Sequence, residues 1–162
     1  MRHRLQCAIA AALAFLGVIV APAVTEAQLR ETHVLSAAAA SKALAAAEGE
    51  ARRNNWNVSI AVVDAAGELV AFIRMDNASP SSASIAPAKA RTAARFRRPT
   101  KALEETIAGG RTVLMSFPDF TPVEGGVPIV VNGQVVGAVG VSGVTSAQDA
   151  QVAQAGASAV TP

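Results

Sequence analysis

The segment that most constrains the fold is residues 124–149, EGGVPIVVNGQVVGAVGVSGVTSAQD. Two apolar, β-branched runs, 127–131 and 135–141, are separated by Asn132-Gly133-Gln134. Asn-Gly between such runs predicts a hairpin, because both central residues of the tight turn require positive φ. Glycines interrupt the second run, where a missing side chain lets another backbone or a ligand come close.

A helix is expected directly after this hairpin. Thr145-Ser146-Ala147-Gln148 has the pattern of a capping box, which opens a last helix that extends to about residue 160. Free N–H groups at a helix N-terminus can hold an anion, so the strand and helix together can form a binding site. A tight turn in a small sheet explains the same pattern, and both interpretations stay open.

The first half of the chain predicts a helix followed by another hairpin. Ser36 is a good N-cap for the alanine-rich run that follows, which should end near residue 54. Residues 56–63 alternate in polarity, and residues 69–75 form a second β-rich run. Asp64 is most simply a residue of the turn between them.

Two further helices are predicted between the hairpins. Ser84 can cap the first of them, and Pro99 ends it. Thr100 can cap a short second helix that ends at Gly109-Gly110. Residues 115–120 are expected to form a loop or an irregular edge.

The N-terminus has the pattern of a secretory signal peptide. Basic residues at positions 2–4 precede an apolar run over 5–20, and small residues follow up to Ala27. An uncleaved membrane anchor is the competing interpretation, but a span needs about 20 apolar residues. We therefore expect residues 1–27 to be cleaved, residues 28–162 to form a single domain without a stable membrane anchor, and the protein to be periplasmic or extracellular.

Composition limits the chemistry of the remaining 135 residues. Cleavage removes Cys7, the only cysteine, so neither a disulfide nor thiol chemistry is expected. The leader holds two of the 14 basic and one of the 12 acidic residues, which leaves a net charge near +1. Tyrosine is absent and aromatic residues are few, so stacking platforms for single-stranded nucleic acid are missing. We expect no nucleic-acid partner.

Few residues of the usual catalytic types remain. His33 is the only histidine outside the leader, so a zinc cluster or a Ser-His-Asp triad cannot be built within one subunit without it. The acidic residues have no diagnostic spacing, and no phosphate-binding loop is present. The sequence thus assigns no catalytic residue. A basic cluster stands out instead, and its members are Lys89, Arg91, Arg95, Arg97, Arg98 and Lys101.

Three blocks of the sequence resemble the GlcG/HbpS-like haem-binding family: SIAVVDAAGELVAFIRMD, KARTAARFRRPTKALEETIAGG and EGGVPIVVNGQVVGAVGVSG. The resemblance extends from about residue 35 to residue 155. It implies an α/β (α+β) domain with an antiparallel sheet of about five strands flanked by helices, profilin-like in layout and assembled into homo-oligomers. It implies no agreed catalytic residues and no shared haem ligands. Residues 74–76, Lys89 and residues 140–143 match family positions.

This resemblance and the signal peptide favour an exported haem-binding protein that sequesters or senses haem and is not an enzyme. The alternative is an accessory or enzymatic protein that acts on a small carboxylate metabolite, such as a hydroxy acid. A purely structural oligomer is a third interpretation. The expected partner is therefore haem or another small anionic ligand.

Residue chemistry then suggests which side chains would contact haem. Haem carries two propionates, and arginine forms charge-assisted, often bidentate bonds to carboxylates. Arg91 and Arg95 share a helical face, with Arg98 just beyond, so we predict them as a propionate clamp; a solvated basic face or an ion-pair rim between subunits is the alternative. His33 is the predicted iron ligand, because no cysteine or tyrosine remains. A solvated residue in a frayed segment is the alternative for His33.

Overall fold

The computed structural model describes residues 32–161, so the predicted signal peptide lies outside the described residues. The elements follow one another in the order α1 (Ala37–Arg53), β1 (Ser59–Asp64), β2 (Leu69–Arg74), α2 (Ser82–Phe96), α3 (Thr100–Ala108), the 3₁₀ helix η1 (Thr112–Ser116), β3 (Gly126–Val131), β4 (Gln134–Ser142) and α4 (Ser146–Ser158).

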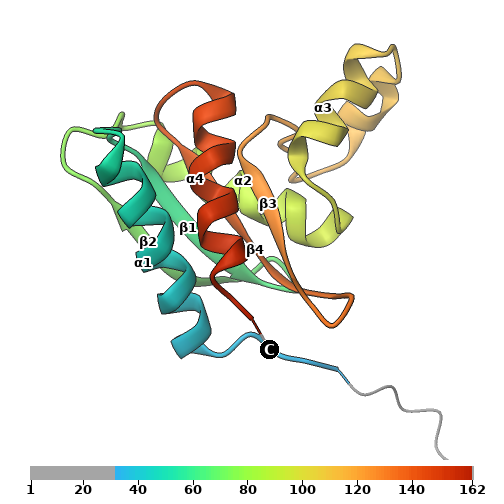
Figure 1. Cartoon of the computed structure of the whole chain (residues 1–162). Helices are drawn as coiled ribbons and strands as arrows, with labels where there is room; N and C mark the ends of the chain where they lie inside the picture. The colour runs from blue at the N-terminus through green and yellow to red at the C-terminus, as the bar shows by residue number, and fades with distance from the viewer. Residues whose placement is uncertain (1–31, 162) are drawn as a thin grey trace, which may run out of the picture. The chain divides into compact units, whose positions relative to one another are not determined.

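The strands form one antiparallel sheet in the order β2-β1-β4-β3 (Figure 1). Each predicted hairpin is present, and the two are joined where β1 pairs with β4, from Ser59 opposite Ser142 to Asp64 opposite Gly137. The α+β class is confirmed. Residues 32–161 contribute four strands where about five were expected, and the chain between α3 and β3 forms η1 and an irregular link.

Helices cover both faces of this sheet. α1 and α4 lie side by side on one face, and α2 lies behind the other (Figure 1). Side chains alternate between the faces of a strand, so Ile60 and Val62 of β1 pack under α1 and α4. Ala61 and Val63 pack instead against alanines of α2. The core therefore has a larger aliphatic layer and a thinner, alanine-lined layer.

Small residues let α2 lie very close to β4. A Cβ atom added to Gly140 would be 2.2 Å from the backbone oxygen of Ala86 and 2.8 Å from the Cβ of Ala90. No side chain can occupy that position without moving the helix. The expectation that another backbone approaches the interrupted strand is thus confirmed, and the neighbour is a helix of the same chain.

The predicted turns are confirmed, and so are two of the four predicted N-caps. Asn132 and Gly133 have φ values of 49° and 76°, as the tight hairpin turn requires. Ser36 accepts the N–H of Ala39 at 3.1 Å, and Thr145 and Gln148 form the complete capping box. Asp64 accepts the N–H groups of two residues of its own turn, each at 2.9 Å.

Two predicted helix starts are wrong. α2 begins at Ser82, with Ser81 as its N-cap, so Ser84 lies inside the helix and its hydroxyl donates to the backbone of Ser81. Thr100 is the first residue of α3 rather than its cap. Its buried hydroxyl oxygen accepts the N–H of Gly126 at 2.9 Å, so this side chain serves a tertiary contact with β3.

Residues 100–120, here called the arm, project from the rest of the domain (Figure 1). α3 buries only Thr100 and Leu103, and η1 buries no residue. Val113, Met115 and Phe117 are exposed by 67%, 57% and 49%. The arm thus carries three large apolar side chains that the described part of the chain leaves uncovered.

Candidate functional site

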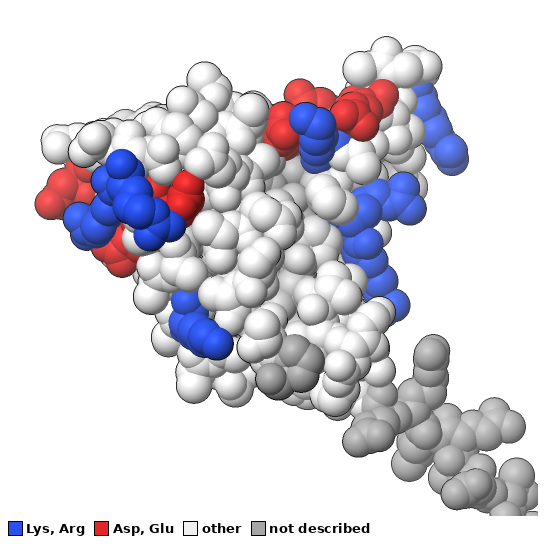
Figure 2. Space-filling view, viewed as in Figure 1, with Lys and Arg blue, Asp and Glu red and all other residues white. Residues whose placement is uncertain are grey.

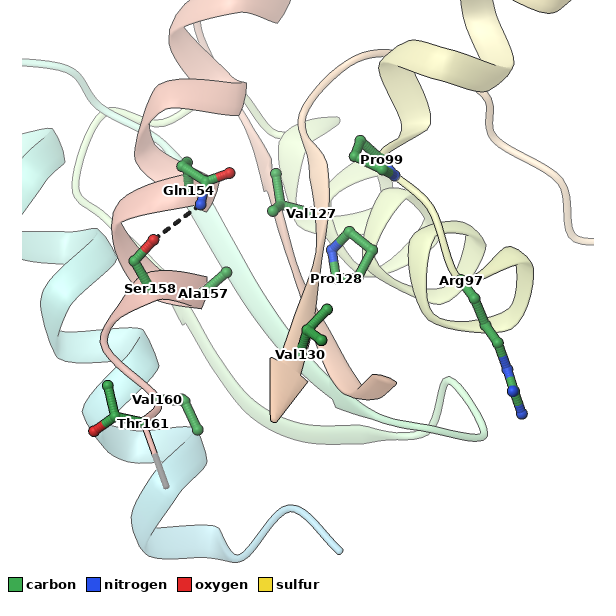
Figure 3. Close-up of a pocket in the computed structure, with 10 residues that line it drawn as sticks. All are labelled: Arg97, Pro99, Val127, Pro128, Val130, Gln154, Ala157, Ser158, Val160 and Thr161. Atoms are coloured by element: carbon green, nitrogen blue, oxygen red, sulfur yellow. Dashed lines mark hydrogen bonds between the residues drawn. The ribbon is translucent and has the colours of Figure 1, made fainter. Parts of the chain in front are cut away.

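A groove of about 560 Å³ follows the edge strand β3 (Figure 3). Val127, Pro128 and Val130 of β3 line it, together with the end of α4 and the following residues up to Thr161. Arg97 and Pro99, from the link between α2 and α3, complete the lining. The volume lies within the range of roughly 300–1,000 Å³ that is usual for small-molecule sites.

The groove exists because, within residues 32–161, β3 has a neighbouring strand on one side only. β4 pairs with it, and its other edge faces outward. Pro128 has no N–H to offer another strand, which suits an edge position. Val130 is 53% exposed although it belongs to a strand. Valine side chains therefore supply an apolar surface that a flat ligand can cover.

Polar groups lie at the margins of the groove. Gln154 donates to the hydroxyl of Ser158 at 2.9 Å on the α4 side. Arg97 caps α2 in the left-handed conformation (φ 54°), and Figure 3 shows its side chain extending away from α4. Its guanidinium makes no hydrogen bond or ion pair within residues 32–161. Arg97 belonged to the predicted basic cluster, but no sequence signal placed it at a cavity.

His33, the predicted iron ligand, lies at the hairpin turn that ends β3. It is exposed, and its Nε2 is 3.4 Å from the Nδ2 of Asn132. Its backbone N–H donates to the side chain of Gln134. Asn132 is two residues beyond Val130, so the imidazole and the groove are associated with the same end of β3.

Arg91 and Arg95, the predicted clamp, contact the β1–β2 turn. The Nε of Arg91 donates to the backbone oxygen of Gly67 at 3.2 Å, and the Nε of Arg95 donates to that of Ala66 at 2.8 Å. Arg95 also forms ion pairs with Glu68 and Asp119. The two side chains do share a helical face, and each already supports a turn. A propionate would have to use their remaining N–H groups.

Arg98, the third predicted clamp residue, points to a different place. It lines a cavity of about 220 Å³ between the end of α2 and the arm, together with Arg111. The structure therefore separates the three arginines: two hold a turn, and the third lies beside the arm. Methionine can also bind haem iron. Met75 is a core residue that is 9% exposed, whereas Met115 is an exposed residue of the arm.

A buried ion pair lies at the opposite end of β3 from the hairpin turn. The Nζ of Lys89, on α2, is 2.9 Å from the Oδ2 of Asp149, on α4, and both side chains are 3% exposed. The backbone N–H of Val144 donates to the other carboxylate oxygen at 3.2 Å. A Cβ on Gly125 would be 2.8 Å from the Nζ. The pair thus joins two helices to the start of β3.

Burial raises the pKa of Asp149 above its ordinary value of 3.8. The Lys89 ammonium and the backbone N–H groups of Val144 and Gly143 act in the opposite direction. Sequence reasoning missed this pair, because 60 residues separate its members. In the sequence, Lys89 stands out as a member of the basic cluster and as a match to a family position, and neither feature points to Asp149.

Neither a metal cluster nor a membrane span is found in the described part of the chain. Across residues 32–161, no three histidine, cysteine, aspartate or glutamate side chains gather where they could hold a metal ion. No helix of those residues is both long enough and apolar enough to cross a membrane.

The chain matches the model of a protein family described as "Haem degrading protein HbpS-like" over residues 35–158. It is 54% identical to Protein GlcG of Escherichia coli K12 over 109 residues, which is 67% of this chain and 81% of that protein. A crystal structure of HbpS superimposes with a TM-score of 0.75 at 36% identity, covering 81% of this chain and 93% of the other. A crystal structure of a PduOC:haem complex superimposes with a TM-score of 0.71 at 27% identity, covering 79% and 96%. The chain therefore belongs to the HbpS-like family, as its three sequence blocks suggested.

Proposed function

We propose that this protein binds haem in the groove along β3. The observation that carries the proposal is a groove of about 560 Å³ with the exposed Val130 in its lining. Arg97, which has no side-chain partner within residues 32–161, lies at its margin, and His33 lies by the turn that ends β3. The family description refers to haem degradation, and one structural relative was solved with haem. Both support the proposal.

The groove residues suit the parts of haem. Val130, which is 53% exposed, and the half-buried Pro128 offer surface to the porphyrin, and Arg97 offers N–H groups to a propionate. His33 is the proposed iron ligand, since an imidazole is a common haem ligand. Holding it in place would cost conformational entropy of about 1–2 kcal/mol per ordered residue. We therefore expect a haem site of modest affinity. The predicted clamp by Arg91, Arg95 and Arg98 stays a prediction.

The test is a haemin titration followed by the Soret band, with a variant that blocks the groove. Val130→Glu places a charge on the apolar surface and is expected to weaken binding at least about tenfold, because burying an unpaired carboxylate is costly. The matched control is Val70→Glu on β2, the other edge of the sheet, where Val70 is also partly exposed (37%). Equal affinity of the two variants would place haem outside the groove.

A second variant examines the iron ligand. His33→Ala is expected to change both the position of the Soret band and the affinity for haemin, because it removes the nitrogen proposed to bind the iron. Asn132→Ala, at the neighbour of His33, is the control and should keep the band position. If His33→Ala retains the parent spectrum and affinity, another group binds the iron.

The same samples can show whether the protein sequesters haem or degrades it. Degradation has to be tested because the family is described as haem degrading. We propose that the protein holds haem without breaking it down. Bound haem should then keep its Soret absorbance during incubation with ascorbate or hydrogen peroxide, relative to free haemin. A faster loss of the band in the presence of the protein would indicate degradation.

We further propose that the protein is exported after cleavage near Ala27 and that it assembles into a homo-oligomer. The exposed apolar side chains of the arm, Val113, Met115 and Phe117, support assembly. Mass spectrometry of protein recovered outside the cytoplasm should find residues 1–27 absent. Light scattering at micromolar concentration should find more than one subunit, and a monomer would refute the assembly.

A further inference from the structure

We propose that the cavity between the end of α2 and the arm binds a small carboxylate with an apolar body. This cavity of about 220 Å³ is lined by Phe96, Arg98, Leu103, Thr106, Arg111 and Leu114. It shares no lining residue with the groove along β3. The proposal therefore does not depend on the haem proposal.

The first observation is charge without a partner. Arg98 reaches the cavity from the link that follows α2 and Arg111 from the start of η1, and no acidic residue among residues 32–161 lines it. Neither guanidinium makes a hydrogen bond or ion pair within residues 32–161. By contrast, Arg52 and Arg53 on α1 are each paired with a glutamate. Figure 2 shows acidic side chains at the top of the molecule where the arm lies, whereas the basic side chains down its right-hand edge have no acidic ones between them. Two unpaired guanidinium groups beside one cavity attract an anion.

The second observation is the apolar part of the lining. Leu103 is 3% exposed, and the ring of Phe96 is held 4.8 Å from that of Phe120. The Thr106 hydroxyl donates to the backbone oxygen of Ala102 at 2.7 Å, so its hydrogen is already used. An inorganic anion would leave the leucine and phenylalanine surface uncovered. An anion with a hydrocarbon body covers it, and arginine favours the planar carboxylate.

The volume limits the size of the ligand. Water takes roughly 30 Å³ per molecule in the liquid, so the cavity has room for roughly seven waters. This is the size of an acid with about ten non-hydrogen atoms or fewer. A short-chain or aromatic monocarboxylate meets the charge, the apolar surface and the size together. Benzoate is a suitable test ligand, and benzyl alcohol is its neutral counterpart.

The experiment is a titration of the purified protein with benzoate, followed by amide chemical shifts. Saturable binding is expected, with shifts near Arg98, Thr106 and Arg111. The variant Arg98→Ala/Arg111→Ala is expected to weaken binding at least about tenfold, since charge-assisted bonds to the carboxylate are lost. Benzyl alcohol should bind the parent protein at least about tenfold more weakly than benzoate for the same reason.

The control is Arg52→Ala, which removes an exposed arginine from α1 and should leave benzoate affinity unchanged. Both cavity arginines are exposed, so the double variant is expected to keep the parent melting temperature. If it does not, Arg98→Gln/Arg111→Gln replaces it, because glutamine keeps the length without the charge. Absence of saturable binding, or equal affinity of the parent and the charge-free variant, would overturn the proposal.

A competition experiment identifies the source of the carboxylate. Arg97 lines the groove, and the next residue, Arg98, lines this cavity, so a propionate of haem is one source and a free acid is the other. Haemin that displaces benzoate assigns the site to a propionate. Haemin that binds without displacement assigns it to a free acid. Both results support the carboxylate site. A protein that binds benzoate and shows no Soret change would refute the haem proposal alone.

Discussion

The middle and the end of α2 use positive charge in opposite ways. Lys89 is buried and bonded to Asp149 of α4. Arg97 and Arg98, past the end of the same helix, are exposed and have no side-chain partner within residues 32–161. A buried charge without a partner strongly destabilises the folded protein, so Lys89 is needed for the ion pair with Asp149. The exposed arginines remain solvated without a partner and are therefore available to a ligand.

Membership of the basic cluster says little about the role of a residue. Six basic residues lie between positions 89 and 101. One joins two helices, and two support the β1–β2 turn. Lys101, on the arm, forms an ion pair with Glu124. The remaining two, Arg97 and Arg98, each belong to the lining of a cavity and have no side-chain partner within residues 32–161. Stability and ligand binding should therefore respond to different members.

The largest expected effect comes from breaking the buried pair. Asp149→Ala leaves the Lys89 ammonium buried without its carboxylate and should lower the free energy of unfolding by about 3–5 kcal/mol. Urea denaturation measures this loss. Lys89→Met/Asp149→Leu removes both charges and should regain most of it. Glu48→Ala, which breaks an exposed pair with Arg52, should cost less than about 1 kcal/mol. Equal losses for the buried and exposed pairs would contradict the comparison.

A smaller effect is expected where arginine supports a turn. Arg91→Ala/Arg95→Ala removes the hydrogen bonds to the backbone oxygens of Gly67 and Ala66. We expect a loss of about 1–2 kcal/mol in the free energy of unfolding. A haemin titration at two salt concentrations tests the predicted clamp in the same variant. Weaker and less salt-sensitive binding would support the clamp; unchanged binding would leave these arginines a structural role alone.

The buried pair also predicts a pH dependence. Because the pKa of Asp149 is raised in the folded protein, its carboxyl keeps a proton at pH values where the unfolded chain has lost it. Its contribution to the free energy of unfolding should therefore decrease as pH rises from 3.8 through the raised pKa, by less than about 1.4 kcal/mol per pH unit. Subtracting urea curves of Asp149→Asn from those of the parent isolates this group. A flat difference would mean that burial does not raise this pKa.

The smallest effect on stability is expected at the exposed end of α2. Arg97→Ala should change the free energy of unfolding by no more than about 0.5 kcal/mol, because its side chain has no partner within residues 32–161 to lose. Its haemin affinity should nonetheless fall by a few-fold, as expected for one solvated charge–charge contact. A stability loss as large as that of Arg91→Ala/Arg95→Ala would show that Arg97 is structural.

Several features could be predicted from the sequence because they depend on neighbouring residues. The Asn132-Gly133 turn, the capping box at Thr145 and the turn role of Asp64 each involve contacts within a few positions. Their residue types leave few alternatives for the backbone. The family could also be recognised, since the three blocks keep their order and spacing. The start of α2 was misjudged because Ser81 and Ser84 are both acceptable cap residues.

The sequence by itself determined the two hairpins, the helices and the supply of basic and apolar side chains, because periodicity and turn chemistry are local. Only the tertiary structure decided which charges meet. Lys89 contacts Asp149, which is 60 positions away in the sequence. His33 likewise contacts Asn132, which is 99 positions away. The groove likewise required β3 to lie at the edge of the sheet with the end of α4 beside it. Such contacts depend on how distant elements pack, and no local pattern specifies that packing.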